Sequence, residues 1–372
     1  MGRKFFPALL LVLALLTGCF EQRYGDLRGY VGIRRNSNVA SLDALSGEIN
    51  PDDIVISSMA LDGDIYYPLE GARVSISGVR DRFGTNEQGM FYAYQIPVGY
   101  REITISHQAL RKDLVKEVRI QEGRDTIEFI GGVGYYIAIG IDKYPSNDVE
   151  NAPGAENDAI SVADVFRRYT KLPGYGVTLL GSEAKKADVE REIRNAVRWA
   201  TPEDYLVIYF AGHMGPDFLS PYDDGGRYYS TAITDSDLED WLGHFPGYVT
   251  VILDGSDSST FADGREPLIR PMALLKPKYT VITSAKEGQD AIVVESDHGL
   301  HGLFSHYLIA GLSTPEELAQ SDKNRDGTIT AWEIFDFIES GMRYYQTKEH
   351  GKVTQEPKLH VGSLDNAVIL RY

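Results

Sequence analysis

Hydrophobic and polar residues follow two different patterns along this chain of 372 residues. From about residue 28 to residue 131, apolar and polar residues alternate in short segments that Gly, Pro, Asn and Asp separate. Alternation with a period of two indicates strands that are buried on one face. This part of the chain is therefore predicted to form a small antiparallel β-sandwich. The polar stretch 36–53 lacks such a pattern and is expected to be a loop.

After residue 131 the pattern changes, and strands are expected to alternate with helices. Unbroken apolar runs predict strands that are buried on both faces, at 135–142, 175–181, 204–211, 249–254 and 278–285. Helical spacing of apolar residues predicts helices at 154–170, 185–200 and 235–242. This alternation is typical of a mostly parallel sheet covered by helices. The fold class is therefore multidomain, with an all-β sandwich over 20–131 and an α/β domain over 132–372.

Two of the predicted strands end in residues that suit nucleophilic catalysis. Gly212-His213 follows the first of them, and Gly255-Ser256 follows the second. Reactive groups in open α/β sheets gather at the carboxyl ends of the strands. A histidine beside a hydroxyl is a pairing that covalent catalysis uses. His213 and Ser256 are therefore the candidate catalytic residues.

The segments around these residues resemble motifs of one peptidase family. YFAGHMG, at 209–215, resembles the histidine strand of the caspase-like peptidases, where the pattern is close to Y-F-S-G-H-G. ILDGSDSS, at 252–259, is similar to the nucleophile strand of that family, usually close to D-A-C-H-S-G. The segments IGID, NDA (157–159) and QEP (355–357) also fit. The resemblance covers roughly the last two-thirds of the chain and implies a caspase-like (metacaspase-type) α/β domain.

Three residues depart from the family pattern. Ser256 stands at the cysteine position, Met214 at the position of a glycine, and Asp257 would add negative charge where charge develops during the reaction. Cys19 is the only cysteine of the chain and lies far upstream. A serine hydroxyl needs strong activation, which a histidine alone supplies poorly. The departures favour a pseudopeptidase that acts as a binding or regulatory module; the alternative is an endopeptidase that uses His213 and an unusual Ser256 nucleophile.

The resemblance also implies a substrate pocket. In metacaspase-like proteins, the aspartate of the N-D segment and the one before the nucleophile line an acidic pocket for Arg or Lys. The matching residues here are Asp158 and Asp254. The expected ligand is therefore a protein or peptide with a basic side chain. An aspartate near a helix start also stabilises the helix dipole without any ligand, so both interpretations remain open.

The segment 322–333, DKNRDGTITAWE, has the spacing of an EF-hand-like calcium loop. Gly327 would permit the sharp turn, and alternate side chains would turn their oxygens inward. Thr314, Pro315 and Glu317 predict a capped helix before the loop. Calcium is therefore the expected cofactor, and a relic loop without metal is the alternative. The expected ligands are Asp322, Asn324, Asp326, Thr328 through its carbonyl, and Glu333.

The N-terminus has the pattern of a lipoprotein signal peptide over 1–19. Arg3-Lys4 precede the apolar run 5–16, which is too short to span a membrane comfortably. The segment LTGC, at 16–19, resembles the bacterial lipobox and implies cleavage before Cys19 and a lipid on its sulfur. The alternative is an ordinary signal peptide or an uncleaved anchor. Phe20 is not the aspartate associated with inner-membrane retention, so an outer-membrane anchor facing the periplasm or exterior is expected.

The remaining features concern the sandwich, the charge and the other histidines. The sandwich resembles the carboxypeptidase regulatory-like fold through the turn and core residues Gly71, Thr85-Asn86, Gly89-x-Phe91 and Ile96-Pro97. These residues are interpreted as structural.

A net charge of −17 argues against nucleic acid as a partner and suits a secreted surface. The other histidines, His301 among them, have no metal-ligand spacing and are expected at the surface or as satisfied core residues.

Overall fold

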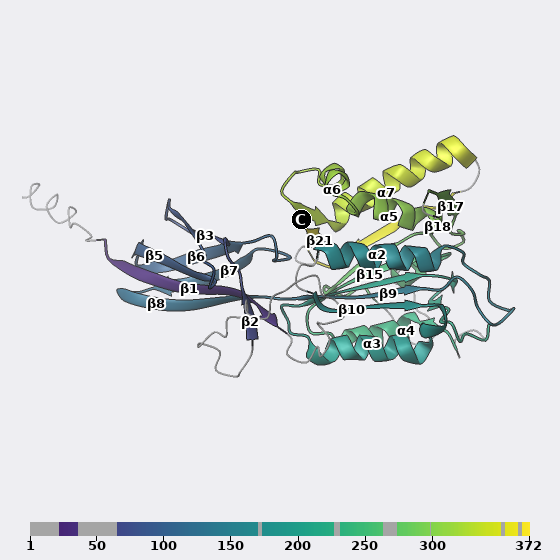
Figure 1. Ribbon diagram of the computed structural model, residues 1–372, viewed down its shortest axis with the longest axis horizontal. Helices are drawn as coiled ribbons and strands as arrows, with labels where there is room; N and C mark the ends of the chain where they lie inside the picture. Colours follow the sequence, from purple (N-terminus) through teal and green to yellow (C-terminus); the bar gives the residue numbers. More distant parts are fainter. Residues whose placement is uncertain are drawn as a thin grey trace, which may run out of the picture.

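A computed structural model describes residues 22–35, 65–169, 173–226, 231–262, 274–297, 299–350, 354–363 and 367–372. The signal segment, Cys19 and the predicted loop 36–53 lie outside these ranges. Within them, a strand-rich N-terminal part is followed by an α/β domain, as the sequence predicts (Figure 1). No helix in the described ranges is long and apolar enough to cross a membrane.

The N-terminal part consists of two four-stranded sheets. Phe91 and Phe129 lie in its core, with ring centroids 6.5 Å apart. All strand pairs are antiparallel except β1 and β8, which are parallel. The prediction of a purely antiparallel sandwich is wrong at this pair, because the chain returns to β1 only after passing through the second sheet. One sheet contains β1 (Tyr24–Arg35), β2 (Ile65–Pro68), β5 (Met90–Pro97) and β8 (Gly123–Gly131), and the other contains β3 (Arg73–Ile76), β4 (Arg82–Gly84), β6 (Gly99–Ser106) and β7 (Leu114–Ile120).

The residues that resemble the carboxypeptidase regulatory-like fold form a turn. The buried Thr85 hydroxyl accepts the N–H of Ala72 at 2.8 Å. Asn86 Oδ1 accepts the N–H of Met90 at 2.9 Å. Gly89 has a φ of +69°, a conformation that favours glycine. These side chains therefore fix the connection between β4 and β5, which agrees with their structural interpretation.

The α/β domain is built on a mixed sheet of six strands in the order β10, β9, β11, β15, β16, β20. The first five strands are parallel, and β20 is antiparallel to β16. Every residue of β9 is buried, as its unbroken apolar run predicts. The strands are β9 (Gly134–Gly140), β10 (Pro173–Leu180), β11 (Tyr205–Ala211), β15 (Tyr248–Asp254), β16 (Tyr279–Thr283) and β20 (Lys358–Val361).

Helices cover both faces of this sheet (Figure 1). Helices α2 (Ala155–Tyr169), α5 (Leu303–Leu312) and α7 (Ala331–Tyr345) lie on one face, and α3 (Lys186–Trp199) and α4 (Asp235–Gly243) lie on the other. A Cβ at Gly140 would come within 2.4 Å of the Ala155 carbonyl oxygen, so α2 packs directly on the end of β9. Helix α6 (Pro315–Ser321) begins with the predicted capping box of Thr314 and Glu317.

Shorter elements complete the domain. The strands β12 (Met214–Gly215), β13 (Phe218–Leu219) and β14 (Ile233–Thr234) form a small sheet after β11. Two further pairs are β17 (Val293–Ser296) with β18 (Gly299–Gly302), and β19 (Thr328–Thr330) with β21 (Val368–Arg371). Three short helices lie between the larger elements: the 3-10 helices η3 (Gly181–Glu183) and η4 (Ser258–Ala262), and the π-helix η5 (Gln346–His350).

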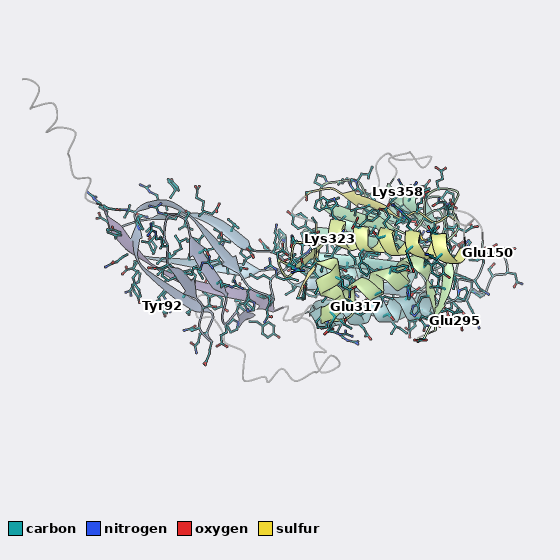
Figure 2. All side chains as sticks on the ribbon, turned by 90° about the horizontal axis from the view of Figure 1, so that it is seen from above. Tyr92, Glu150, Glu295, Glu317, Lys323 and Lys358 are labelled. Atoms are coloured by element: carbon teal, nitrogen blue, oxygen red, sulfur yellow. The ribbon has the colours of Figure 1, made fainter. Side chains whose placement is uncertain are left out.

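The sandwich and the α/β domain meet at the amino ends of the parallel strands. The N–H of Val133 donates to Asp204 Oδ1 at 2.7 Å. The Arg111 guanidinium stacks on the Tyr205 ring at 4.6 Å, and burial lowers the pKa of Arg111 to about 10. The carboxyl ends of these strands therefore point away from the sandwich. Figure 2 shows the distant end of the α/β domain, where Glu150 is labelled.

Candidate functional site

The two candidate catalytic residues follow neighbouring strand ends. Strands β11 and β15 are parallel partners, with Ala211 opposite Asp254. His213 and Ser256 each come two residues later, so both lie at the carboxyl edge of the sheet, as predicted. Both residues are described, and no hydrogen bond joins the imidazole to the Ser256 hydroxyl.

His213 is held through its backbone and surrounded by aromatic rings. Its N–H donates to the Tyr144 hydroxyl at 2.9 Å. The rings of Tyr144 and Phe218 lie 6.3 and 6.4 Å from the imidazole, centroid to centroid. Burial lowers the pKa of His213, and the nearby charge of Glu150 opposes this shift only in part. The imidazole is therefore neutral near pH 7 and able to accept a proton.

The loop that carries Ser256 is fastened to the segment 288–291. Ser256 Oγ accepts the N–H of Ala291 at 3.1 Å. The next residue, Asp257, has a φ of +55°; its N–H donates to the Gln289 carbonyl at 3.1 Å, and its carboxylate accepts the N–H of Gly288. Among the described residues, none accepts the proton of the Ser256 hydroxyl. Over the described ranges, the serine oxygen thus accepts a backbone N–H and forms no hydrogen bond with a base.

Met214 fills space beside the nucleophile position. Its side chain is buried, with 2% of its surface exposed. A Cβ on Gly255 would lie 2.6 Å from both Cγ and Sδ of Met214. The thioether therefore packs on the backbone directly before Ser256. A glycine at position 214, as in the caspase-like pattern, would leave this volume open.

Asp158 and Asp254, the two residues expected to line an acidic pocket, lie on either side of Gly302. The Gly302 N–H donates to Asp158 Oδ2 at 2.8 Å, and a Cβ on Gly302 would lie 2.2 Å from Asp254 Oδ2. Asp254 Oδ2 also accepts the N–H and the hydroxyl of Ser305, at 3.2 and 2.5 Å. Its Oδ1 is buried and has no hydrogen-bond partner in the described part of the chain. The two carboxyl groups are 1% and 5% exposed, so they form a buried acidic pair rather than an open surface.

His301 belongs to this acidic pair, a contact that the sequence did not indicate. It is a buried core histidine, and its Nδ1 lies 2.6 Å from Asp158 Oδ1. Burial raises the pKa of Asp158 to about 7, and the hydrogen bond to Asp158 raises the pKa of His301. The two residues are 143 positions apart, and only the β17–β18 hairpin brings them together. No local spacing could have revealed this contact.

Because the pKa of Asp158 is raised, we expect this residue to lower the free energy of unfolding as the pH rises. Folded Asp158 keeps its proton to about pH 7, whereas an unfolded aspartate loses it near pH 4. The folded state then binds more protons, so the free energy of unfolding falls between these two pH values. Because Asn resembles the protonated carboxyl, Asp158→Asn is expected to gain about 4 kcal/mol relative to wild type from about pH 4 to pH 8, measured by urea unfolding.

A matched control for this experiment is Asp164→Asn, on the same helix. The Asp164 side chain is 43% exposed and forms an ion pair with Arg167. The stability difference between this variant and wild type should stay nearly constant over the same pH range. A constant difference for Asp158→Asn as well would contradict the role assigned to the buried acidic pair.

The predicted calcium loop turns oxygen atoms inward. The Asp322 carboxylate accepts the N–H groups of Asp326 and Gly327, at 3.2 and 2.8 Å. Asn324 Oδ1 accepts the N–H of Asp326 at 2.9 Å, and Glu333 Oε1 reaches back to the N–H of Asn324 at 3.4 Å. Carboxylate and amide oxygens suit calcium, so the residues fit the ion chemically. Over the described ranges, however, no three His, Cys, Asp or Glu side chains are grouped closely enough to hold a metal.

The C-terminal residues connect this loop to the sandwich. Strand β19 of the loop pairs with β21, and the Tyr372 hydroxyl donates to Asp322 Oδ2 at 3.2 Å. Arg371 forms an ion pair with Asp113 of the sandwich at 3.1 Å. The chain end thus supplies the strand partner that a second EF-hand loop provides in paired sites.

Comparisons with known proteins give a likeness of fold at low identity. No protein-family description matches the chain, and no curated protein matches it. Among solved structures, a Geobacter sulfurreducens protein is 16% identical, with a TM-score of 0.42 over 61% of this chain and 92% of its own. The structure of pro-sf-caspase-1 is 11% identical, with a TM-score of 0.41 over 64% and 89%. Caspase-1 from Spodoptera frugiperda is also 11% identical, with a TM-score of 0.38 over 64% and 88%.

Two of these three solved structures are caspases. At identities of 11% to 16% they say nothing about activity.

Proposed function

We propose that this chain is a lipid-anchored, caspase-like protein of the cell envelope that binds a protein or peptide ligand without hydrolysing it. The observation that carries the proposal is the state of Ser256. Its hydroxyl accepts a backbone N–H from Ala291 and lies in a loop where Met214 covers the preceding backbone. A serine without an aligned base is a poor nucleophile at neutral pH.

The buried acidic pair supports a ligand with a basic side chain. No group in the described part of the chain forms a hydrogen bond with the buried Asp254 Oδ1, and burial of such an atom is costly unless another group pairs with it. His301 already places an imidazole nitrogen 2.6 Å from Asp158 Oδ1, so this carboxyl group has room for a nitrogen-bearing side chain beside it. In the proposed bound state, an Arg or Lys side chain of the ligand replaces His301 beside Asp158 and reaches Asp254.

Two measurements test this function. Wild type is incubated with Arg- and Lys-containing peptides, with and without calcium, and with a serine-directed covalent probe. We expect neither hydrolysis nor labelling, and turnover that disappears in Ser256→Ala would instead support the endopeptidase.

Binding is compared between an Arg-containing peptide and its neutral citrulline counterpart, and equal affinities would contradict a role for the acidic pair.

Membrane association is proposed to depend on Cys19. Several acyl chains on one residue anchor a protein stably in a membrane, whereas a single acyl chain binds only marginally and reversibly. Cys19→Ser is expected to move the protein from the membrane fraction to the soluble fraction, measured by fractionation and immunoblotting. A variant that stays in the membrane fraction as wild type does would refute the lipid anchor.

Calcium is proposed as the ion of the loop 322–333. The inward oxygens of Asp322, Asn324 and Glu333 support this assignment. In this proposal the ion stabilises the fold and takes no part in chemistry at Ser256.

A further inference from the structure

Three chain segments meet at the end of the sandwich where β1 begins. Tyr24, the first residue of β1, lies opposite Pro97 at the end of β5. The Arg23 carbonyl accepts the N–H of Val98 at 2.9 Å. Gly25 lies opposite Gly123, the first residue of β8. We call this end of the sandwich, made of residues 22–26, 94–101 and 119–124, the tip.

Large apolar side chains are exposed at the tip. Tyr24, Tyr94 and Tyr100 are 49%, 59% and 66% exposed, and Val98 is 36% exposed. The inward residues of the same strands are fully buried, so these tyrosines are not needed for the sandwich core. A tyrosine ring with a polar hydroxyl suits an environment that is apolar at one end and wet at the other. Membrane interfaces are enriched in such residues.

The length of chain before Tyr24 limits where the tip can lie. Cys19 is five residues away, and an extended chain spans at most about 18 Å over that distance. If Cys19 carries a lipid, the tip is therefore held within that distance of the bilayer. Figure 1 shows that β1 begins at the end of the molecule that is remote from the α/β domain.

The charge of the tip differs from that of the whole protein. The tip contains four arginines and two acidic residues, and Glu21 and Asp125 adjoin its ends, so its charge is close to balanced in a chain of net charge −17. One pair is internal, since Arg23 contacts Glu122 at 3.1 Å. Basic groups near an anionic lipid surface are attracted to it. The arginines are Arg23, Arg101, Arg119 and Arg124, and the acidic residues are Asp26 and Glu122.

We propose that the tip docks on the surface of an anionic phospholipid bilayer, with Tyr24, Tyr94 and Tyr100 at the level of the headgroups. This inference rests on the proposed lipid anchor, which brings the tip to the membrane. Docking fixes the orientation of the protein, because the sandwich separates the tip from the α/β domain (Figure 1). The strand ends that carry His213 and the acidic pair then face away from the membrane, where a protein ligand can reach them.

The experiment tethers the tip to a bilayer without any lipid on the protein. A chain that begins at residue 20, with an N-terminal histidine tag, is bound to vesicles of phosphatidylethanolamine and phosphatidylglycerol containing nickel-chelating lipid. Cys19 is absent, so Val98→Cys or Tyr344→Cys introduces a single site for a fluorescent label. Tyr344 is 67% exposed on α7, far from the tip. Tethering is expected to reduce iodide quenching of the label at 98 by about twofold and to leave the label at 344 unchanged.

Substitutions then separate docking from tethering. Replacing Tyr24, Tyr94 and Tyr100 by Ser is expected to abolish the protection of the label at 98. Tyr92→Ser is the matched control, because Tyr92 is 45% exposed on the same strand as Tyr94 but lies outside the tip (Figure 2). Equal quenching at 98 and 344, or protection that survives the triple substitution, would overturn the inference. Because the tag replaces the lipid, this result does not depend on whether Cys19 is lipidated.

Discussion

The triple variant Met214→Gly, Ser256→Cys and Asp257→His is expected to cleave Arg- or Lys-containing peptides slowly, and wild type is expected not to cleave them. The thiol ionises far more readily than the serine hydroxyl beside a histidine. His213 can receive the proton, because burial lowers its pKa and leaves it neutral near pH 7. The measurement is the release of a fluorophore from a basic peptide substrate over hours.

The thiol alone is expected to restore little activity. In Ser256→Cys, the Met214 thioether still packs on Gly255, and a carboxylate that accepts the N–H of Gly288 still follows the nucleophile position. Both features adjoin the nucleophile position, so the triple variant should exceed Ser256→Cys by about 10²-fold, the size of effect that one group at an oxyanion site typically has on kcat. His tolerates the positive φ of residue 257 better than most residues do, and the N–H of that residue can still donate to the Gln289 carbonyl, but the carboxylate contact with the Gly288 N–H is lost.

Two controls make the result specific. Adding His213→Ala to the triple variant should abolish the cleavage. Ser259→Cys places a thiol three residues away in the same loop and should give no activity in the background of the other two substitutions. A triple variant that is folded by circular dichroism and still inert would mean that more than these three residues separates this site from an active one.

The strands and helices of the α/β domain could be predicted because each has a strong local pattern. The apolar runs placed β9, β11 and β15 within about two residues, and the apolar stripes placed α2 and α3 equally well. The short strands β12, β13 and β14 contain no apolar run that predicts them, and neither does the pairing of β19 with the chain end. Both features depend on contacts between segments that are distant in the sequence. The parallel pairing of β1 with β8 was missed for the same reason, since a strand's own sequence does not reveal its neighbour.

In the candidate site, too, some features could be predicted from the sequence and others depend on contacts between distant segments. That His213 and Ser256 lie at one edge of the sheet follows from the order of strands, and the meeting of Asp158 with Asp254 follows from the resemblance. Whether these side chains touch does not follow from either. The missing hydrogen bond between His213 and Ser256, and the contact of His301 with Asp158, depend on how a hairpin and a loop pack. Both features are therefore seen only in the folded structure.

Calcium is expected to raise the melting temperature of the protein, and Glu333→Gln to remove most of that rise. The loop is single, and its strand partner is the chain end rather than a second calcium loop, so we expect a dissociation constant of about 10⁻⁴ M. At about 5 mM calcium, such an ion adds about 2 kcal/mol to the free energy of unfolding. For a protein of this size the melting temperature then rises by about 3 °C, measured by scanning calorimetry.

The control must separate metal binding from helix capping, because Glu333 does both. Its carboxylate accepts the N–H and hydroxyl of Thr330 in a capping box at the start of α7. Glu317 has the same capping role at the start of α6 but is no expected ligand. Because Gln also completes a capping box, Glu317→Gln should change the melting temperature little, and equally with and without calcium, and leave the calcium-dependent rise intact. An equal rise in wild type and Glu333→Gln, or no heat of binding at millimolar calcium, would rule out the proposed site.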